Sequence, residues 1–160
     1  MKSFIGILIT CAVAIIAGNL VVSSAQGDPF SFSLGDISFA EGYNRELIAI
    51  GNTLITADIA DTPEKRTLGL SGREALLPDT GMLFVFDKEG NHSIWMKDMH
   101  FSIDILWLND MYEIVHIEKR VSPDTYPTSF TSPIPASYVL EVPAGFTSTH
   151  TVRVGDIVGR

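Results

Sequence analysis

The sequence predicts a mainly β domain, a compact barrel or sandwich with one or two short helices. Short apolar segments recur from residue 45 onward, separated by turns rich in Asp, Asn, Gly or Pro at intervals typical of all-β domains. Only one segment carries the start signals of a helix. A chain of 160 residues that is 46% hydrophobic has room for one domain with an ordinary core.

The N-terminus differs from the rest of the chain. Lys2 is followed by an almost uninterrupted apolar segment, residues 4–22, and then by Ser23-Ser24-Ala25. This order is typical of a secretory signal peptide that is cleaved after Ala25. The alternative is an uncleaved membrane anchor, because the segment approaches the roughly 20 residues that span a bilayer. Residues 1–25 therefore predict export, and contact with the membrane only through these residues if they are retained.

Charge and cysteine content exclude several classes of function. The net charge is −8, and Cys11, within the predicted signal, is the only cysteine. The exported part therefore has no disulfide, thiol nucleophile or zinc–thiolate site. An acidic domain also argues against nucleic acid or an anionic membrane surface as a partner. We expect no cofactor and no metal site.

The first elements follow from local signals. Residues 26–42 are rich in Gly, Ser, Asp and Phe without a period, which predicts a flexible tether before a single β domain at 43–160. Residues 47–50 and 53–59 flank Gly51-Asn52, a pattern that favours a hairpin. Asp61-Thr62-Pro63-Glu64 then provides a cap, a proline in the first turn and an acid at the positive end of a helix dipole. Gly69 and Ser71-Gly72 keep that helix short.

The remaining apolar segments predict strands. They are residues 82–86, 94–97, 103–108, 113–121, 136–142 and 151–158. Residues 122–137 contain four prolines among many Ser and Thr, so we expect an extended surface loop there.

Charged residues within apolar strands mark the candidate site, because motifs of known catalytic sites are absent. Both faces of residues 103–108 are apolar except for Asp104, so this strand is expected to be covered on both sides. A buried carboxylate needs a partner, and we expect Lys97, Arg66 or Arg73 to pair with it. Glu141, within "YVLEV", poses the same problem.

These acids allow three interpretations. The first is a structural network of ion pairs with tryptophans in the core. The second is a binding site for a small polar or saccharide ligand. The third is a glycan hydrolase, in which Asp104 and Glu141 form the acid pair while Trp95 and Trp107 stack on sugar rings.

A copper(I) site is a further hypothesis. Trp95, Met96, Met99 and His100 provide the thioether, imidazole and indole groups that suit this ion in an oxidising compartment. In a continuous strand, however, Met96 and His100 would share one face while Trp95 and Met99 share the other. Only a turn near Asp98 would bring the four together.

The pieces "IADTPEKRTLGLSGREAL", "GMLFVF", "IWMKDMHFSIDILWL", "YVLEVPAG" and "VGD" occur in the order and at the spacing of a known prokaryotic family. Residues 47–158 are thus identified as resembling the domain of unknown function 192. The resemblance implies a compact, mostly β fold, often behind a signal peptide, and it implies no reaction. The polar residues that it carries over are Arg66, Arg73, Lys97, Asp104 and Glu141, with Met82, Trp95 and Met96 beside them.

This chain departs from the family pattern at two places. Asp98-Met99 stands where the family usually has Asn-Thr, and Ser102 stands where it usually has Pro. Met99 is therefore not a family feature, which counts against copper as a shared role. The sequence thus favours an exported cell-envelope domain without catalytic activity, whose charged cluster binds a small polar or saccharide ligand or an envelope component. The hydrolase and the copper(I) carrier are the alternatives.

Overall fold

The computed structural model describes residues 12–16, 19–23, 30–32 and 42–160, and the chain forms two compact units, Met1–Ser38 and Phe39–Arg160. In the first unit, β1 (Ala12–Ile16), β2 (Asn19–Ser23) and β3 (Phe30–Phe32) form an antiparallel sheet. The predicted signal or anchor and most of the predicted tether otherwise lie outside the described residues. No helix in the described part of the chain combines the length and apolar character needed to cross a bilayer.

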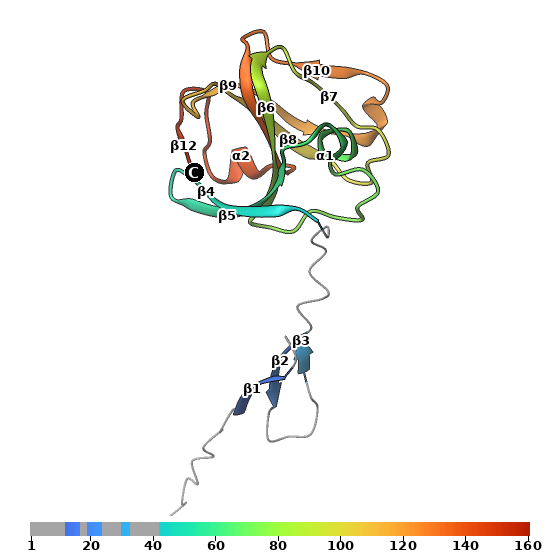
Figure 1. Cartoon of the computed structure of the whole chain (residues 1–160), viewed down its shortest axis with the longest axis vertical. Coiled ribbons are helices and arrows are strands. Elements are labelled where there is room, and N and C mark those ends of the chain that lie inside the picture. Colours follow the sequence, from blue (N-terminus) through green and yellow to red (C-terminus); the bar gives the residue numbers. More distant parts are fainter. Residues whose placement is uncertain (1–11, 17–18, 24–29, 33–41) are drawn as a thin grey trace, which may run out of the picture. The chain divides into compact units, whose positions relative to one another are not determined.

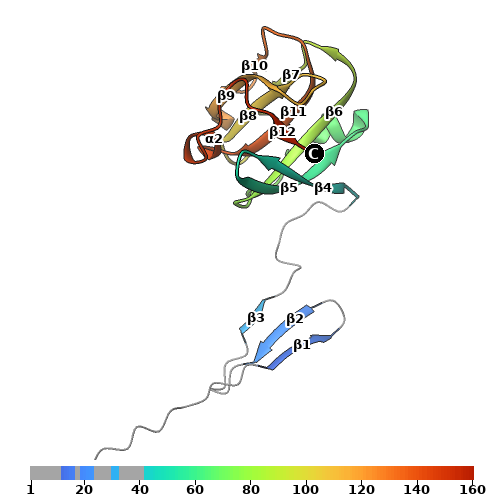
Figure 2. The same cartoon turned by 90° about the vertical axis from the view of Figure 1, so that its left-hand side faces the viewer.

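The second unit is built on one curled sheet of seven strands, in the order β12-β4-β5-β6-β11-β8-β9 (Figures 1 and 2). Only the β5–β6 pair is parallel. The strands of this sheet are β4 (Asn44–Ile50), β5 (Thr53–Ala60), β6 (Thr80–Gly90), β8 (Ile103–Leu108), β9 (Ile114–Val121), β11 (Ala136–Pro143) and β12 (Val158–Gly159). The prediction of a mainly β, barrel-like domain with short helices is confirmed.

Local chemistry explains the first elements. Gly51 adopts φ +59° in the β4–β5 turn, a conformation that glycine allows without strain. The helix α1 (Pro63–Leu68) begins after Thr62, whose hydroxyl accepts a hydrogen bond from the Lys65 N–H at 3.3 Å. It ends at Gly69, where φ is +53°. Both the hairpin and the short helix are therefore confirmed.

The sheet buries apolar side chains on both faces. One core cluster holds Leu83, Leu106, Leu140 and Val142 from the central strands, and α2 (Phe146–Thr149) contributes Phe146 to it. The opposite face carries a second core cluster, which is covered by the segment after α1 and by β7 (Ser93–Trp95). In Figure 1, α2 lies on one side of β6 and β8, whereas α1, β7 and β10 (Ser129–Thr131) lie on the other. This second face is where the candidate site lies.

Three predicted elements need correction. The expected loop at 122–137 contains the 3₁₀ helix η2 (Pro123–Thr125) and β10, which pairs with β7. The predicted strand at 151–158 is mostly turn, and only β12 at its end joins the sheet. The strand expected at 94–97 ends at Trp95 as β7, so Lys97 and Asp98 are exposed in a turn, where Asp98 has φ +55°. Short polar segments such as β10 lack the apolar alternation by which strands are recognised.

Candidate functional site

Three acids lie inside apolar strands of the sheet, and the strand register separates them. Asp58 lies opposite Met82, Met82 opposite Glu141, and Glu141 opposite Ile105, so these residues form one row across the second face. Asp104 lies opposite Val142 and belongs to the first face. Because residues directly opposite one another project to the same side of a sheet, Glu141 and Asp104 point away from each other.

Asp104 is a structural acceptor. Its side chain is fully buried, and Oδ1 accepts the N–H groups of Arg120 (2.8 Å) and Gly145 (3.0 Å). Oδ2 accepts the Thr147 N–H (3.0 Å) and the Thr147 hydroxyl (2.6 Å). Burial by itself raises the pKa of Asp104, but the hydrogen bonds from Gly145, Thr147 and Arg120 outweigh it and hold the pKa below its usual value. The prediction that a cation pairs with Asp104 is wrong, because main-chain N–H groups and the Thr147 hydroxyl stabilise this carboxylate.

Arg73 pairs with a different acid. Its Nη1 donates to Asp58 Oδ2 at 2.9 Å, and Arg45 Nε donates to Asp58 Oδ1 at 3.2 Å. The Arg73 side chain is only 10% exposed, and its Nη2 atom has no hydrogen-bond partner. The guanidinium lies over the Tyr43 ring, 5.7 Å from the centroid, and burial raises the pKa of the Tyr43 phenol despite this positive charge. This ion pair lies at the Asp58 end of the row.

Glu141 is a buried acid for which the structure records no side-chain hydrogen bond. It is 4% exposed, and none of the ion pairs among the described residues includes it. Burial raises the pKa of Glu141 to about 8, and the positive charge of Arg73 only partly opposes this effect. A buried polar side chain without a partner is uncommon, and one that faces a cavity marks a candidate binding site.

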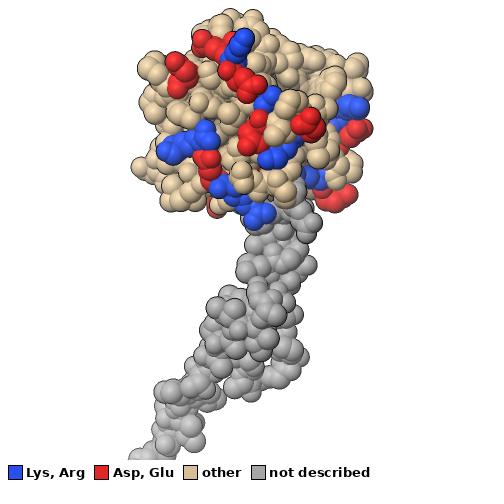
Figure 3. All heavy atoms as spheres, viewed as in Figure 1, with Lys and Arg blue, Asp and Glu red and all other residues tan. Residues whose placement is uncertain are grey.

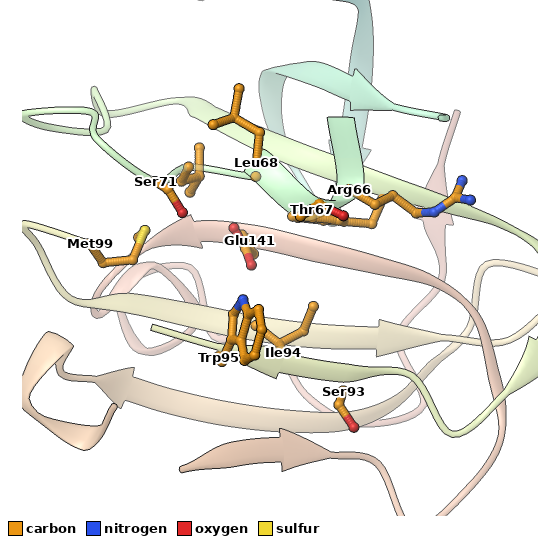
Figure 4. Close-up of a pocket in the computed structure, with 12 residues that line it drawn as sticks. Arg66, Thr67, Leu68, Ser71, Ser93, Ile94, Trp95, Met99 and Glu141 are labelled. Carbon is orange, nitrogen blue, oxygen red and sulfur yellow. The ribbon is translucent and has the colours of Figure 1, made fainter. Parts of the chain in front are cut away.

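Glu141 faces a hollow between α1 and β7. This Glu141 cavity has a volume of about 50 Å³, enough for a small group. It is lined by Arg66, Thr67, Leu68, Gly69, Leu70, Ser71, Phe84, Ser93, Ile94, Trp95, Met99 and Glu141. Figure 4 shows the Glu141 carboxylate between α1 with Ser71 on one side and Trp95 on the other.

The Glu141 cavity adjoins two wider hollows. One, of about 540 Å³, extends toward Glu64, Lys97 and Asp98. The other, of about 320 Å³, extends toward Phe86. All three share Thr67 and Trp95 as lining residues, so together they form one depression, here called the α1 groove. The groove is the candidate functional site.

The predicted site residues divide into those that line the groove and those that do not. Arg66, Trp95, Lys97 and Glu141 line it. Met82 and Met96 are buried in the second core cluster, and neither they nor Arg73 and Asp104 are among the lining residues. Arg66 lines the groove with its stem, because its Nη1 donates to the carbonyls of Asp61 (3.0 Å) and Val85 (2.7 Å) and the guanidinium points away from Glu141 in Figure 4.

The hypothesis that Asp104 and Glu141 form the acid pair of a glycan hydrolase is wrong. Such a pair needs both carboxyl groups in one open cleft, whereas Asp104 is sealed in the core on the other face. Trp107 also cannot stack on a sugar, since it is fully buried and donates its indole N–H to the His92 carbonyl at 3.0 Å. Trp95, in contrast, is 49% exposed at the groove.

The structure brings only part of the predicted copper ligand set together. The turn after Trp95 brings Met99 into the lining of the Glu141 cavity. Met96 is instead 1% exposed in the core, and His100 Nδ1 lies 3.4 Å from Glu74 Oε1 at the surface. Within the described residues, no group of three His, Cys, Asp or Glu side chains is arranged to hold a metal ion.

Sequence reasoning missed Asp58 as the partner of Arg73, and it missed the groove-lining hydroxyls of Thr67 and Ser71. The signal for Asp58 was present, since "TADIA" places an acid in an apolar strand as "VLEV" does. The two hydroxyls carried no such signal. They line the groove only because α1 folds back over the sheet.

Two solved structures resemble this chain. One is a "putative transcription regulator" from Sinorhizobium meliloti 1021, 28% identical, with a TM-score of 0.71 over 76% of this chain and 97% of that one. The other is a protein of unknown function from Novosphingobium aromaticivorans DSM 12444, 19% identical, with a TM-score of 0.71 over 81% of this chain and 99% of that one. The second likeness shows the fold alone.

None of the curated proteins searched is similar enough to count as a match. Residues 47–159, well over half of the chain, match the model of the family described as Uncharacterized ACR. The chain therefore belongs to this family, the domain of unknown function 192.

Proposed function

We propose that this protein is an exported cell-envelope domain without catalytic activity that binds a small polar ligand, foremost a saccharide, in the α1 groove. The observation that carries the proposal is the exposed ring of Trp95 beside a buried Glu141 that has no hydrogen-bond partner among the described residues. Export rests on the apolar segment that follows Lys2 and on the small residues that end at Ala25.

Trp95 supports a ligand with an apolar face. Its ring is half exposed although it is a large aromatic side chain, and it meets Tyr126 edge to face with centroids 6.4 Å apart. Tyr126 is 47% exposed, and Leu68, another lining residue of the groove, is 55% exposed. A sugar ring has apolar C–H faces that stack on such aromatic surfaces while its hydroxyls stay available for hydrogen bonds.

The polar groups of the groove support a ligand that is also polar. Glu64, Lys97 and Asp98 border its wider end, so both signs of charge are available there. Glu141 lies at the narrow end. This distribution, in which an apolar wall lies between a few separated polar groups, is typical of sites that fix the orientation of a small ligand.

Binding is favoured over hydrolysis because the Glu141 cavity itself offers one carboxylate, while Glu64 and Asp98 border only the wider hollow. Glycoside hydrolysis uses two carboxyl groups that flank the scissile bond. Asp58, the other acid of the row, is held by Arg73 and Arg45 and does not line the cavity. Asp104 is on the opposite face.

DNA binding is an alternative suggested by the name of the Sinorhizobium protein. We favour the small ligand, because the chain has a net charge of −8 and phosphate backbones are bound by basic surfaces. On the face shown in Figure 3, Lys and Arg are interspersed with Asp and Glu over the described residues.

A thermal-shift screen of the full chain against cell-wall fragments, simple sugars and copper(I) tests the proposal. A ligand at a hundred times its dissociation constant adds about 2.7 kcal/mol, which moves the melting midpoint by a few degrees. We expect Trp95→Ala to abolish the shift. Leu54→Ala, which removes another exposed side chain but one on β5 and outside the groove, should retain it. The proposal fails if no sugar or cell-wall fragment shifts the midpoint, or if Trp95→Ala keeps the full shift.

A further inference from the structure

Three polar side chains in the lining of the Glu141 cavity, those of Thr67, Ser71 and Glu141, offer hydrogen-bond acceptors. The Thr67 hydroxyl donates its proton to the Pro63 carbonyl at 2.8 Å, and the Ser71 hydroxyl donates to the Lys97 carbonyl at 2.8 Å. Each hydroxyl therefore has only lone pairs left for a ligand. The Glu141 carboxyl group supplies two further oxygens and is not used by any described residue.

The Arg and Lys side chains near the groove do not donate to Glu141. Arg73 is held at Asp58, and Arg66 donates to the Asp61 and Val85 carbonyls with its guanidinium turned away from Glu141 (Figure 4). Lys97 borders the wider part of the groove and is not in the lining of the Glu141 cavity. A positively charged donor for the ionised form of Glu141 would therefore come from outside the described part of the domain.

The size of the cavity sets the size of that donor. A volume of about 50 Å³ holds an ammonium group with its attached carbon, whereas a sugar ring fits only the wider hollows of about 540 and 320 Å³. Figure 4 shows the Trp95 ring beside Glu141, where the remainder of a bound ligand would lie against it.

We propose that the Glu141 cavity binds a primary ammonium group, so that the ligand of the α1 groove is an amine, such as an amino sugar or another alkylammonium compound. The ammonium donates to the Glu141 carboxylate and to the lone pairs of Thr67 and Ser71, while the remainder of the ligand lies against Trp95. This inference rests on the proposed function and names the chemical class of its ligand.

Amine binding is then linked to pH. Burial raises the pKa of Glu141 to about 8, so an ammonium that binds only the ionised acid must displace a proton. Affinity should rise roughly 50-fold between pH 6 and pH 8, because the ionised fraction of Glu141 grows from about 1% to about a half. The charged groups that face Glu141 across the row are Arg73 and its partner Asp58, and the neighbouring positions on β6 and β8 are Met82 and Ile105.

Isothermal titration of the full chain with matched probes tests the inference. The first pair is 6-amino-6-deoxyglucose against glucose, which differ by an ammonium in place of a hydroxyl on the same ring. The second pair is butylamine against 1-butanol, which separates the ammonium from the sugar. We expect each amine to bind at least tenfold more tightly than its alcohol at pH 8, and the amine affinity to fall toward pH 6. Glu141→Gln, which keeps the shape and cannot ionise, should remove both the preference and its pH dependence.

The outcomes separate this inference from the proposed function. Equal binding of glucose and its amino derivative overturns the inference and leaves the saccharide site standing. Binding of butylamine without either sugar supports the ammonium site and overturns the saccharide site. Absence of binding by every probe overturns both. Should Glu141→Gln fail to fold, the two matched probe pairs decide, since amines that bind the parent protein no more tightly than their alcohols at pH 8 contradict the inference.

Discussion

Replacing Asp104 by Asn should lower the free energy of unfolding by about 3 kcal/mol. Asp104 accepts two hydrogen bonds on each oxygen, from Arg120 and Gly145 on one and from Thr147 on the other. Asn replaces one oxygen by an NH₂ group, which then faces donors instead of accepting from them. Hydrogen bonds to a charged group contribute about 1.5–3 kcal/mol each, so the loss of two gives about 3 kcal/mol or more.

Urea denaturation followed by tryptophan fluorescence measures this change, because Trp107 is fully buried. Asp110→Asn, at an exposed position, is the matched control and should leave the midpoint unchanged. The pKa of Asp104 is lowered on folding. Its contribution is therefore complete above the unfolded value of 3.8 and disappears as the pH falls through the folded pKa. The difference between Asp104→Asn and the parent should narrow in that acid range. A variant within about 0.5 kcal/mol of the parent at pH 7, with an unchanged m-value, would refute the reasoning.

Three further predictions concern Gly81, which precedes Met82 on β6, and the acids Asp58 and Glu141 of the row. Gly81→Ala should destabilise the fold by about 2 kcal/mol, because the added Cβ would lie 2.7 Å from the Glu141 carbonyl oxygen. The control is Gly90→Ala on the same strand, whose Cβ meets only the His92 ring at 3.5 Å, so its thermal melting midpoint should stay near that of the parent. Asp58→Asn should lower the free energy of unfolding in urea by about 3–5 kcal/mol, because buried Arg73 loses its counter-ion. Asp61→Asn, which removes the surface pair with Lys65, should change this free energy little, and equal effects of the two variants would contradict the burial argument. Glu141→Gln should stabilise the protein by about 3 kcal/mol at pH 7. The pKa of Glu141 is raised from 4.5 to about 8 on folding, so the parent protein loses stability as the pH rises through that interval, whereas the variant does not. A stability gain that does not grow between pH 5 and pH 8 would show that Glu141 is not held neutral.

Two of the three buried acids could be located from sequence because a charge inside an apolar strand is a local signal. Asp104 and Glu141 were both identified in this way, and both are buried. Their partners could not be identified, because partners depend on which face of the sheet each residue occupies relative to the neighbouring strands. The expected cation at Asp104 was replaced by N–H groups from β9 and from the start of α2, a helix that no sequence signal indicated.

Trp95 and Trp107 show the same division. The sequence places both among apolar residues at strand positions, with nothing to distinguish them. Trp107 lies in a central strand covered on both faces, while Trp95 ends a short strand paired with β10 and stays half exposed beside α1. The coverage of a strand by distant elements made one ring part of the core and the other part of the groove.

The sequence by itself determined the mainly β class, the first hairpin, the short capped helix and the presence of acids in apolar strands, where burial acts on their pKa values. These features depend on period, turn chemistry and capping, which act over a few neighbouring residues. Only the tertiary structure decided that Asp58, Met82 and Glu141 form one row, that Arg73 closes one end of it, and that Asp104 lies on the other face. Strand register decides this, because a shift of one residue reverses the face on which every side chain lies.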